Sequence, residues 1–166
     1  MSKTARIVGI SLAAAFAGGL TVSASAQLVT HKDLTTGMAM TMAETAIQTC
    51  KQQGYNVSAN VVGRTGQVLV AMRGDNTGPH TLENSMKKAY TANAQRRPSG
   101  EYAKAFQANP PRGGALLTNL VPAQGALPIK VGEDTIGAIG VSGAPGGDKD
   151  EACAKAGIDK VAADLK

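Results

Sequence analysis

One stretch near the C-terminus decides the fold: Pro128-Ile129-Lys130-Val131-Gly132-Glu133-Asp134-Thr135-Ile136-Gly137-Ala138-Ile139-Gly140-Val141-Ser142-Gly143. Its two β-rich runs, Gly125 to Val131 and Thr135 to Val141, flank the turn Gly132-Glu133-Asp134 and predict a β-hairpin. A tight turn joins antiparallel strands. After the loop Gly146-Gly147-Asp148, a helix is predicted from Asp148 to Leu165 on an apolar face of Ala154, Ile158, Val161 and Leu165.

A second hairpin is predicted earlier in the chain. Asn56 to Val62 and Gln67 to Met72 are β-rich, and the turn signal Gly63-Arg64-Thr65-Gly66 lies between them. Because Val68 to Met72 is apolar on both faces, we expect that strand to be central in the sheet. Leu116 to Val121 is a candidate for one further short strand.

Helical periodicity marks the other segments. Leu34 to Gln53 is predicted as a helix that Thr35 or Thr36 caps and Gly54 ends, with an apolar stripe of Met40, Ala43, Ile47 and Cys50. Thr81 to Ala94 and Glu101 to Ala108 predict two more helices. The element order therefore predicts an α+β fold, with about five antiparallel strands and helices packed on them.

The first 26 residues have the layout of a secretory signal peptide. Lys3 and Arg6 are followed by an uncharged run from Ile7 to Leu20 and by an A-x-A cleavage site, Ala24-Ser25-Ala26. An uncleaved membrane anchor is the alternative, but the run is shorter than the roughly 20 apolar residues that a spanning helix needs. We expect one domain over residues 27–166, with no membrane span after signal removal and a periplasmic or secreted location.

The charge pattern argues against nucleic acid as a partner. Without Lys3 and Arg6, 15 basic and 12 acidic side chains remain, which is a net charge of +3. The basic residues are scattered, and the chain has three Tyr, two Phe and no Trp. A nucleic-acid-binding surface usually combines a basic stripe with aromatic side chains.

The chain has two cysteines, Cys50 and Cys153, and export permits a disulfide between them. If the two helices that carry them share one face of the sheet, the bond would close a loop of about 100 residues, worth roughly 4–5 kcal/mol in the chain-entropy model. Two unpaired, partly buried thiols are the alternative.

Two segments resemble the GlcG/HbpS family of small haem-binding domains. The first comprises Val68-Leu69-Val70-Ala71-Met72-Arg73-Gly74-Asp75, Gly78-Pro79-His80-Thr81 and Lys88-Ala89-Tyr90-Thr91-Ala92. The second is the C-terminal run quoted above, which continues to Asp150-Glu151-Ala152-Cys153-Ala154. The resemblance implies a profilin-like fold, a homo-oligomer that is commonly an octamer, and haem as the ligand.

Candidate haem-site residues follow from this resemblance and from side-chain chemistry. His80 is the candidate metal ligand, because neutral imidazole binds haem iron well. Arg73 and Lys88 are candidates for binding propionates, and Asp75 lies in the same loop as Arg73. Ser99 occupies a position comparable to that of a Thr that one family member is thought to use.

Structural alternatives stand beside these assignments. A lone His80 is a poor signal for a ligand and is also explained as a polar loop histidine that ligates nothing. Arg73 and Asp75 are explained equally well as an ion pair that holds the loop. His31 is a second candidate ligand in the N-terminal lead, and the absence of C-x-x-C-H excludes covalent c-type attachment. Gly137 and Gly140 within a strand indicate close approach of a helix, a strand or a flat ligand.

Three functions remain open at this point. The first is an exported haem- or tetrapyrrole-binding protein that acts as a carrier, scavenger or sensor. The second is an enzyme that degrades haem or acts on a small organic acid, although no nucleophile elbow or metal-ligand cluster is apparent. The third is a cofactor-free oligomeric accessory protein of a periplasmic system.

Overall fold

The computed structural model describes residues 27–110 and 117–166. The described part of residues 31–166 forms one compact unit, and residues 27–30 are exposed and without regular structure. The predicted signal peptide, residues 1–26, lies outside the described residues.

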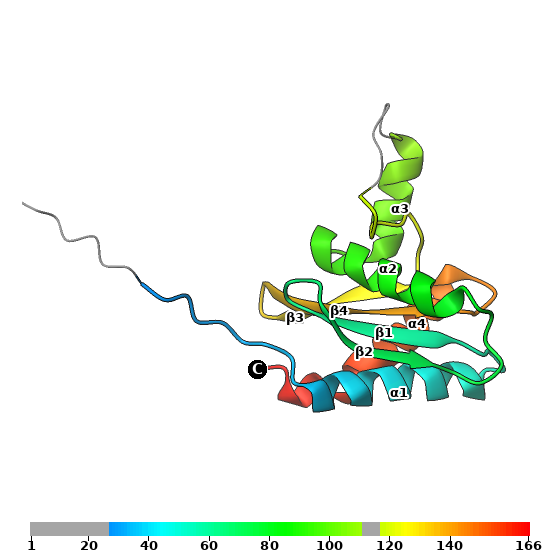
Figure 1. Cartoon of the computed structure of the whole chain (residues 1–166), viewed down its shortest axis with the longest axis horizontal. Helices are drawn as coiled ribbons and strands as arrows, with labels where there is room; N and C mark the ends of the chain where they lie inside the picture. Colours follow the sequence, from blue (N-terminus) through cyan, green and yellow to red (C-terminus); the bar gives the residue numbers. More distant parts are fainter. Residues whose placement is uncertain (1–26, 111–116) are drawn as a thin grey trace, which may run out of the picture. The chain divides into compact units, whose positions relative to one another are not determined.

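The described residues of the domain form four α-helices and four strands. In chain order they are α1 (Thr36–Gln52), β1 (Ser58–Gly63), β2 (Val68–Arg73), α2 (Thr81–Gln95), α3 (Ser99–Ala108), β3 (Ala126–Val131), β4 (Asp134–Ser142), α4 (Gly147–Lys160) and a short 3₁₀ helix, η1 (Ala162–Asp164). The strands form one antiparallel sheet in the order β2-β1-β4-β3. In Figure 1, α1 and α4 lie on one side of this sheet, and α2 and α3 lie on the other.

The predicted α+β fold is confirmed, with the sheet built from both predicted hairpins. The candidate strand at Leu116 to Val121 does not form over its described part, because residues 117–121 run through a turn. Leu116 itself lies outside the described residues. Over the described residues the sheet has four strands, which is roughly consistent with the expected number of about five.

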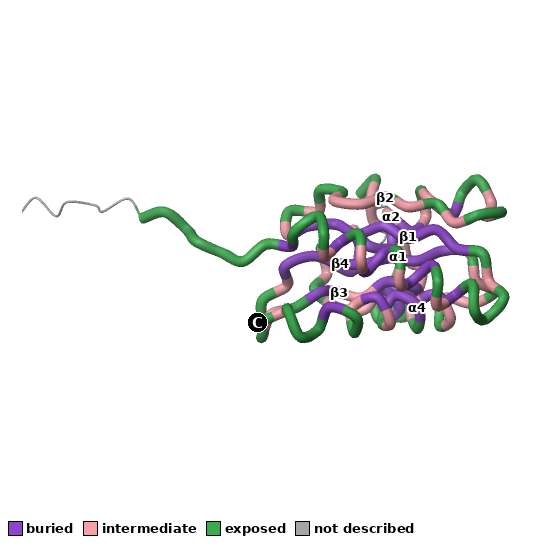
Figure 2. Tube along the Cα trace, turned by 90° about the horizontal axis from the view of Figure 1, so that it is seen from below, coloured by how far each residue is buried: buried purple, intermediate pink, exposed green. Residues whose placement is uncertain are grey.

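The strand expected at the centre lies at the edge. β2 pairs with β1 alone among the described residues, each of its residues is exposed or half-buried, and Val68 is 47% exposed. Figure 2 shows β1 and β4 as the buried strands. The expected strand order was wrong because Asn60 made one face of β1 look exposed to solvent in the sequence. Asn60 is instead buried, and its side-chain amide donates to Leu82 O on α2 at 2.9 Å.

The main core lies between the sheet and the pair α1 and α4. Along α1 the buried residues are Ala39, Met42, Ala43, Ala46, Ile47 and Cys50. The predicted stripe was therefore right at three positions and wrong at Met40, which is 52% exposed. Thr35 is the observed N-cap, and its hydroxyl accepts a hydrogen bond from the Met38 N–H at 3.2 Å.

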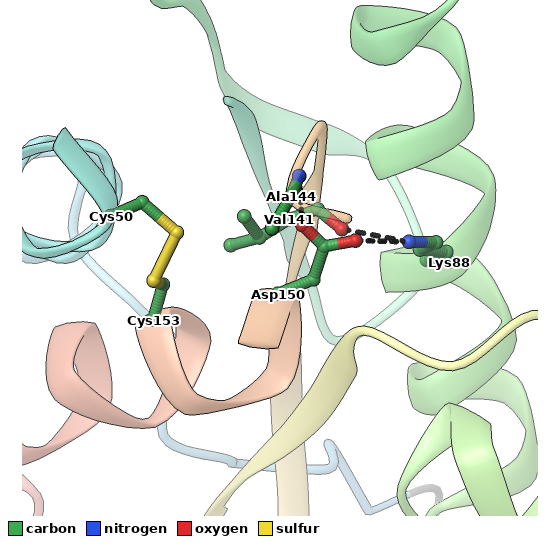
Figure 3. The surroundings of a disulfide bond; sticks show 6 residues. All are labelled: Cys50, Lys88, Val141, Ala144, Asp150 and Cys153. Atoms are coloured by element: carbon green, nitrogen blue, oxygen red, sulfur yellow. Dashed lines mark hydrogen bonds and ion pairs between the residues drawn. A yellow bond between two sulfur atoms is a disulfide. The ribbon is translucent and has the colours of Figure 1, made fainter. Parts of the chain in front are cut away.

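A covalent bond ties these two helices together. Cys50 on α1 and Cys153 on α4 form a disulfide, with their Cα atoms 5.7 Å apart (Figure 3). Both side chains are fully buried in the main core. The bond thus links segments that are 103 residues apart in the chain.

Small residues let α2 lie close to the opposite face of the sheet. A Cβ atom at Gly140 would overlap Ser85 O and the backbone of Ala89 on α2. The cluster beneath the helix consists of Val62, Ala89, Ala92, Ala126 and Ala138. Of the alternatives that the sequence left open for Gly140, close approach of a helix is the one observed.

Candidate functional site

The loop between β2 and α2 is held by Arg73. Its guanidinium donates to Thr77 Oγ1 at 3.2 Å, to Gly78 O at 3.1 Å and to Pro79 O at 3.0 Å. Asp75 does not pair with Arg73. Its carboxylate lies 3.6 Å from Lys51 Nζ on α1, and the Asp75 side chain is 85% exposed. Arg73 therefore shapes this loop through carbonyl and hydroxyl groups.

His80 lies at the N-cap position of α2 and is exposed. Its side chain makes no capping hydrogen bond, and it has no hydrogen-bond partner among the described residues. The imidazole is thus accessible to a ligand. His31 also lies on the surface, where its Nε2 is 3.2 Å from Asp33 Oδ2.

Lys88 lies inside the domain. Its Nζ is 2.8 Å from Asp150 Oδ2 and donates to Val141 O at 3.1 Å, while Asp150 Oδ1 accepts from the Ala144 N–H at 3.0 Å (Figure 3). Burial raises the pKa of Asp150 above its ordinary 3.8, and the Lys88 ammonium offsets part of that rise. Lys88 is committed to this pair, so it does not fit the predicted role of binding a propionate.

Ser99 is also committed to the fold. It begins α3, is fully buried, and its Oγ accepts a hydrogen bond from the Ala126 N–H at 3.0 Å. An iron ligand at this position would have to break that bond and enter the protein interior. The hydroxyl therefore does not fit the role that the resemblance implied.

A groove of about 330 Å³ lies where the C-terminal half of α1 meets the end of β2. We call it the α1–β2 groove. Its apolar lining consists of Ile47, Tyr55, Val57 and Met72, and its charged lining consists of Glu44, Lys51, Arg73 and Asp75. Of the predicted site residues, the groove brings together Arg73 and Asp75; His80, Lys88 and Ser99 are not among its lining residues.

Tyr55 is the groove residue that the sequence analysis missed. It follows Gly54, which has a φ of +82° and turns the chain from α1 toward β1. The ammonium of Lys149 on α4 lies 5.2 Å from the centre of the Tyr55 ring, a cation–π contact. The Tyr55 hydroxyl has no hydrogen-bond partner among the described residues. A single tyrosine after a turn carries no sequence signal that could have identified it.

The chain matches a protein family over residues 34–159, and that family is described as haem degrading protein HbpS-like. The chain belongs to the HbpS-like family. The crystal structure of HbpS is 34% identical, with a TM-score of 0.75, and the match covers 80% of this chain and 93% of that one. A double mutant of HbpS from Streptomyces reticuli is 31% identical, with a TM-score of 0.76, over 86% and 97% of the two chains.

More distant structures share the fold of this HbpS-like chain. Klebsiella pneumoniae ORFY is 26% identical with a TM-score of 0.74, and the match covers 82% of this chain and 97% of that one. The structure of the PduOC:heme complex is 22% identical with a TM-score of 0.67, over 78% and 95% of the chains. No curated protein shows significant similarity to the chain.

The described residues contain neither a metal-binding cluster nor a membrane-spanning helix. Within residues 27–110 and 117–166, no group of three or more His, Cys, Asp or Glu side chains is arranged to hold a metal ion. In the same ranges, no helix is both long and apolar enough to cross a membrane.

Proposed function

We propose that this protein is an exported haem- or tetrapyrrole-binding protein that acts as a carrier, scavenger or sensor. The observation that carries the proposal is the match of residues 34–159 to a family of haem-degrading, HbpS-like proteins. The PduOC:heme complex adds that a protein of this fold can hold haem.

Some of the candidate site residues are accessible to a haem, and others are not. Lys88 and Ser99 are buried and bonded, whereas His80 and the α1–β2 groove are open to a ligand. The groove lining holds two cations, Lys51 and Arg73, and two carboxylates, Glu44 and Asp75, beside its apolar side chains. Haem, when bound, supplies an iron centre that accepts an axial ligand and can exchange an electron.

Export is part of the proposal. The buried Cys50–Cys153 disulfide supports it, because such bonds persist in oxidising compartments outside the cytosol. We expect cleavage after Ala26, so that the mature chain begins at Gln27. Intact-mass measurement on protein recovered from the exported fraction tests this expectation. A mass that still includes residues 1–26 would contradict it.

Hemin titration of the purified protein tests ligand binding. We expect a saturable shift of the Soret band at a fixed number of haems per chain, measured against hemin in buffer and against hemin with an unrelated protein of similar charge. A spectrum equal to that of free hemin at every ratio would refute haem binding and leave only the fold.

Haem degradation is a second candidate, favoured by the description of the family as haem degrading. Oxidative opening of the porphyrin ring consumes dioxygen and electrons, and an external reductant would supply the electrons. Incubation of the haem-loaded protein with ascorbate in air tests it. Loss of the Soret band together with iron release would support an enzyme, and an intact band would support a binding protein.

Self-association is also proposed, as the resemblance implied. The edge strand β2 supports it, because one side of the strand lacks a strand partner among the described residues and Val68 is exposed on it. Light scattering after size-exclusion chromatography would give the number of chains. A monomer at all concentrations would refute the oligomer.

A further inference from the structure

We propose that two copies of the chain join through the free edge of β2, which pairs antiparallel with β2 of the second copy around a two-fold axis. The four described strands of each copy would then form one continuous sheet. Such a contact between identical edges closes after two copies, so it does not grow into a fibre. This inference rests on the proposed self-association and names the surface that carries it.

The two edge strands of the sheet differ in how well they are protected. At one edge, β3 contains Pro128, which has no N–H to donate, and the exposed Lys130. Proline and lysine are residues with which proteins prevent edge-to-edge pairing of sheets. At the other edge, β2 contains neither residue type, and it pairs with β1 alone among the described residues. A further strand can therefore add at β2.

The direction of the backbone groups places Ala71 at the free edge. The Gly74 N–H donates to Val57 O at 3.1 Å and thus points toward β1. Backbone groups point alternately to the two sides of a strand, so those of Ala71 and Arg73 point away from β1. When Ala71 pairs with Ala71 of the second copy, the two residues exchange N–H···O bonds and their Cα atoms lie about 5.5 Å apart.

Exposed apolar side chains lie on both faces of this edge. Val68 is 47% exposed and pairs with Val62, whose side chain belongs to the cluster beneath α2. On the opposite face of the sheet, α1 carries Met40, which is 52% exposed. Met40 lies two helical turns before Ile47, which lines the α1–β2 groove, so both are on the side of α1 that faces β2. A second copy at this edge would cover both exposed side chains.

Met40 lies at the level of Ala71 along the sheet. A Cβ atom at Gly74 would be 3.4 Å from the Ile47 side chain, and the C-terminal half of α1 lies at the end of β2, so the two elements run in the same direction. The three residues from Gly74 back to Ala71 span roughly 10 Å. That distance corresponds to about seven helical residues, counted back from Ile47 to Met40. A two-fold axis at Ala71 therefore brings Met40 of the two copies together.

The spacing of the helices permits this contact. α1 contacts both β1 and β2 and runs beneath them in Figure 1. Neighbouring strands are about 4.8 Å apart, so the axis lies half that distance beyond β2. If α1 is centred between β1 and β2, the two copies of α1 are about 10 Å apart. Packed helices lie about 8–10 Å apart, so α1 can pack directly against its copy.

The charges of α1 suit this antiparallel packing. The first turn of α1 contains no acidic residue, and Glu44 lies one turn after Met40. With Met40 at the axis, Glu44 of one copy lies beside the first turn of α1 in the second copy. A carboxylate at that position is favoured by the helix dipole.

Lysine variants test the surface. Val68→Lys and Met40→Lys each place a charge in the contact, and Leu117→Lys is the matched control, because Leu117 is 71% exposed but belongs to neither α1 nor β2. Each substitution occurs twice in a two-fold contact. We therefore expect each of the two variants to weaken self-association by about tenfold or more in a sedimentation dilution series, and the control to leave it unchanged. Far-UV circular dichroism checks folding, which should persist because all three side chains are exposed.

A cross-link tests the pairing itself. Cys50 and Cys153 are bonded to each other and the chain has no other cysteine, so one added cysteine reports on one contact. Ala71→Cys should form a disulfide between two copies under mild oxidation, because its expected Cα separation lies within the range of about 4.4–6.8 Å that disulfides need. Lys130→Cys, on the protected edge, is the control and should stay unlinked on a non-reducing gel.

The outcomes separate the surface from the self-association. If the unaltered protein is a monomer at all concentrations, the proposed self-association fails and this inference fails with it. If the protein associates but Val68→Lys and Met40→Lys retain its affinity, or Ala71→Cys does not cross-link, self-association stands and the β2 contact is overturned. Cross-linking of Lys130→Cys alone would place the contact at β3 and overturn the inference as well.

Discussion

Lys88→Met removes the cation of a buried ion pair and leaves the carboxylate in place. The two side chains are 5% and 4% exposed, with 2.8 Å between Lys88 Nζ and Asp150 Oδ2. After the substitution, Asp150 keeps only the hydrogen bond from the Ala144 N–H. An uncompensated buried charge costs about 3–5 kcal/mol, which is a large share of the total stability of about 5–15 kcal/mol expected for a domain.

The double variant Lys88→Met with Asp150→Asn isolates the interaction. Both charges are then absent, and the asparagine oxygen can still accept the Ala144 hydrogen bond. We expect the double variant to lose less stability than the sum of the two single variants, by about 2 kcal/mol or more. Such a difference would measure the coupling between α2 and α4 across the sheet.

Urea unfolding at pH 7, followed by circular dichroism, gives the free energy of unfolding for each variant. Lys87→Met is the matched control, because Lys87 is the neighbouring residue and its pair with Glu83 is partly exposed. The control should cost less than about 1 kcal/mol. A cost below about 1 kcal/mol for Lys88→Met, or additive single variants, would refute the reasoning.

Three further predictions concern stability. Replacing Cys50 and Cys153 with Ala should lower the free energy of unfolding by about 2–5 kcal/mol. Urea unfolding under non-reducing conditions measures this loss, and an unchanged midpoint would contradict the disulfide. Gly140→Ala should cost about 1–3 kcal/mol or more, because its Cβ would overlap Ser85 O, and a neutral effect in thermal unfolding would contradict this packing. Burial raises the pKa of Glu151 above its ordinary 4.5, so its stabilising contribution is complete below that pH and is lost as the pH rises through the raised value. Glu151→Gln should therefore be the more stable form at pH 7, by less than about 1 kcal/mol, and lose that advantage in acid; the opposite trend in a pH series would refute it.

Local patterns were sufficient for the elements of this fold. Alternating β-rich runs around short turns identified both hairpins, and the period of Ala43, Ile47 and Cys50 identified α1. Strand order was harder, because it depends on what covers each face. Asn60 is polar and buried since α2 supplies its partners, and Val68 is apolar and exposed since β2 is an edge strand.

The site was less accessible to sequence reasoning than the fold. Arg73 and Asp75 were identified through the family motif, and both line the α1–β2 groove. Tyr55 was not identified, because it joins them only through the packing of the α1–β1 connection against the end of β2. Lys88 was wrongly assigned to a ligand. Its buried partner is Asp150, which is 62 positions away in the chain, so no local pattern indicated that the two residues pair.

The motifs that resemble the family therefore carry more information on the fold than on the ligand. Lys88 and Asp150 come from two different motifs, and each is the partner of the other. Thr91, from the same motif as Lys88, accepts a hydrogen bond from the Val121 N–H at 2.9 Å and so fixes the segment that leads to β3. All three residues are thus engaged in contacts within the fold.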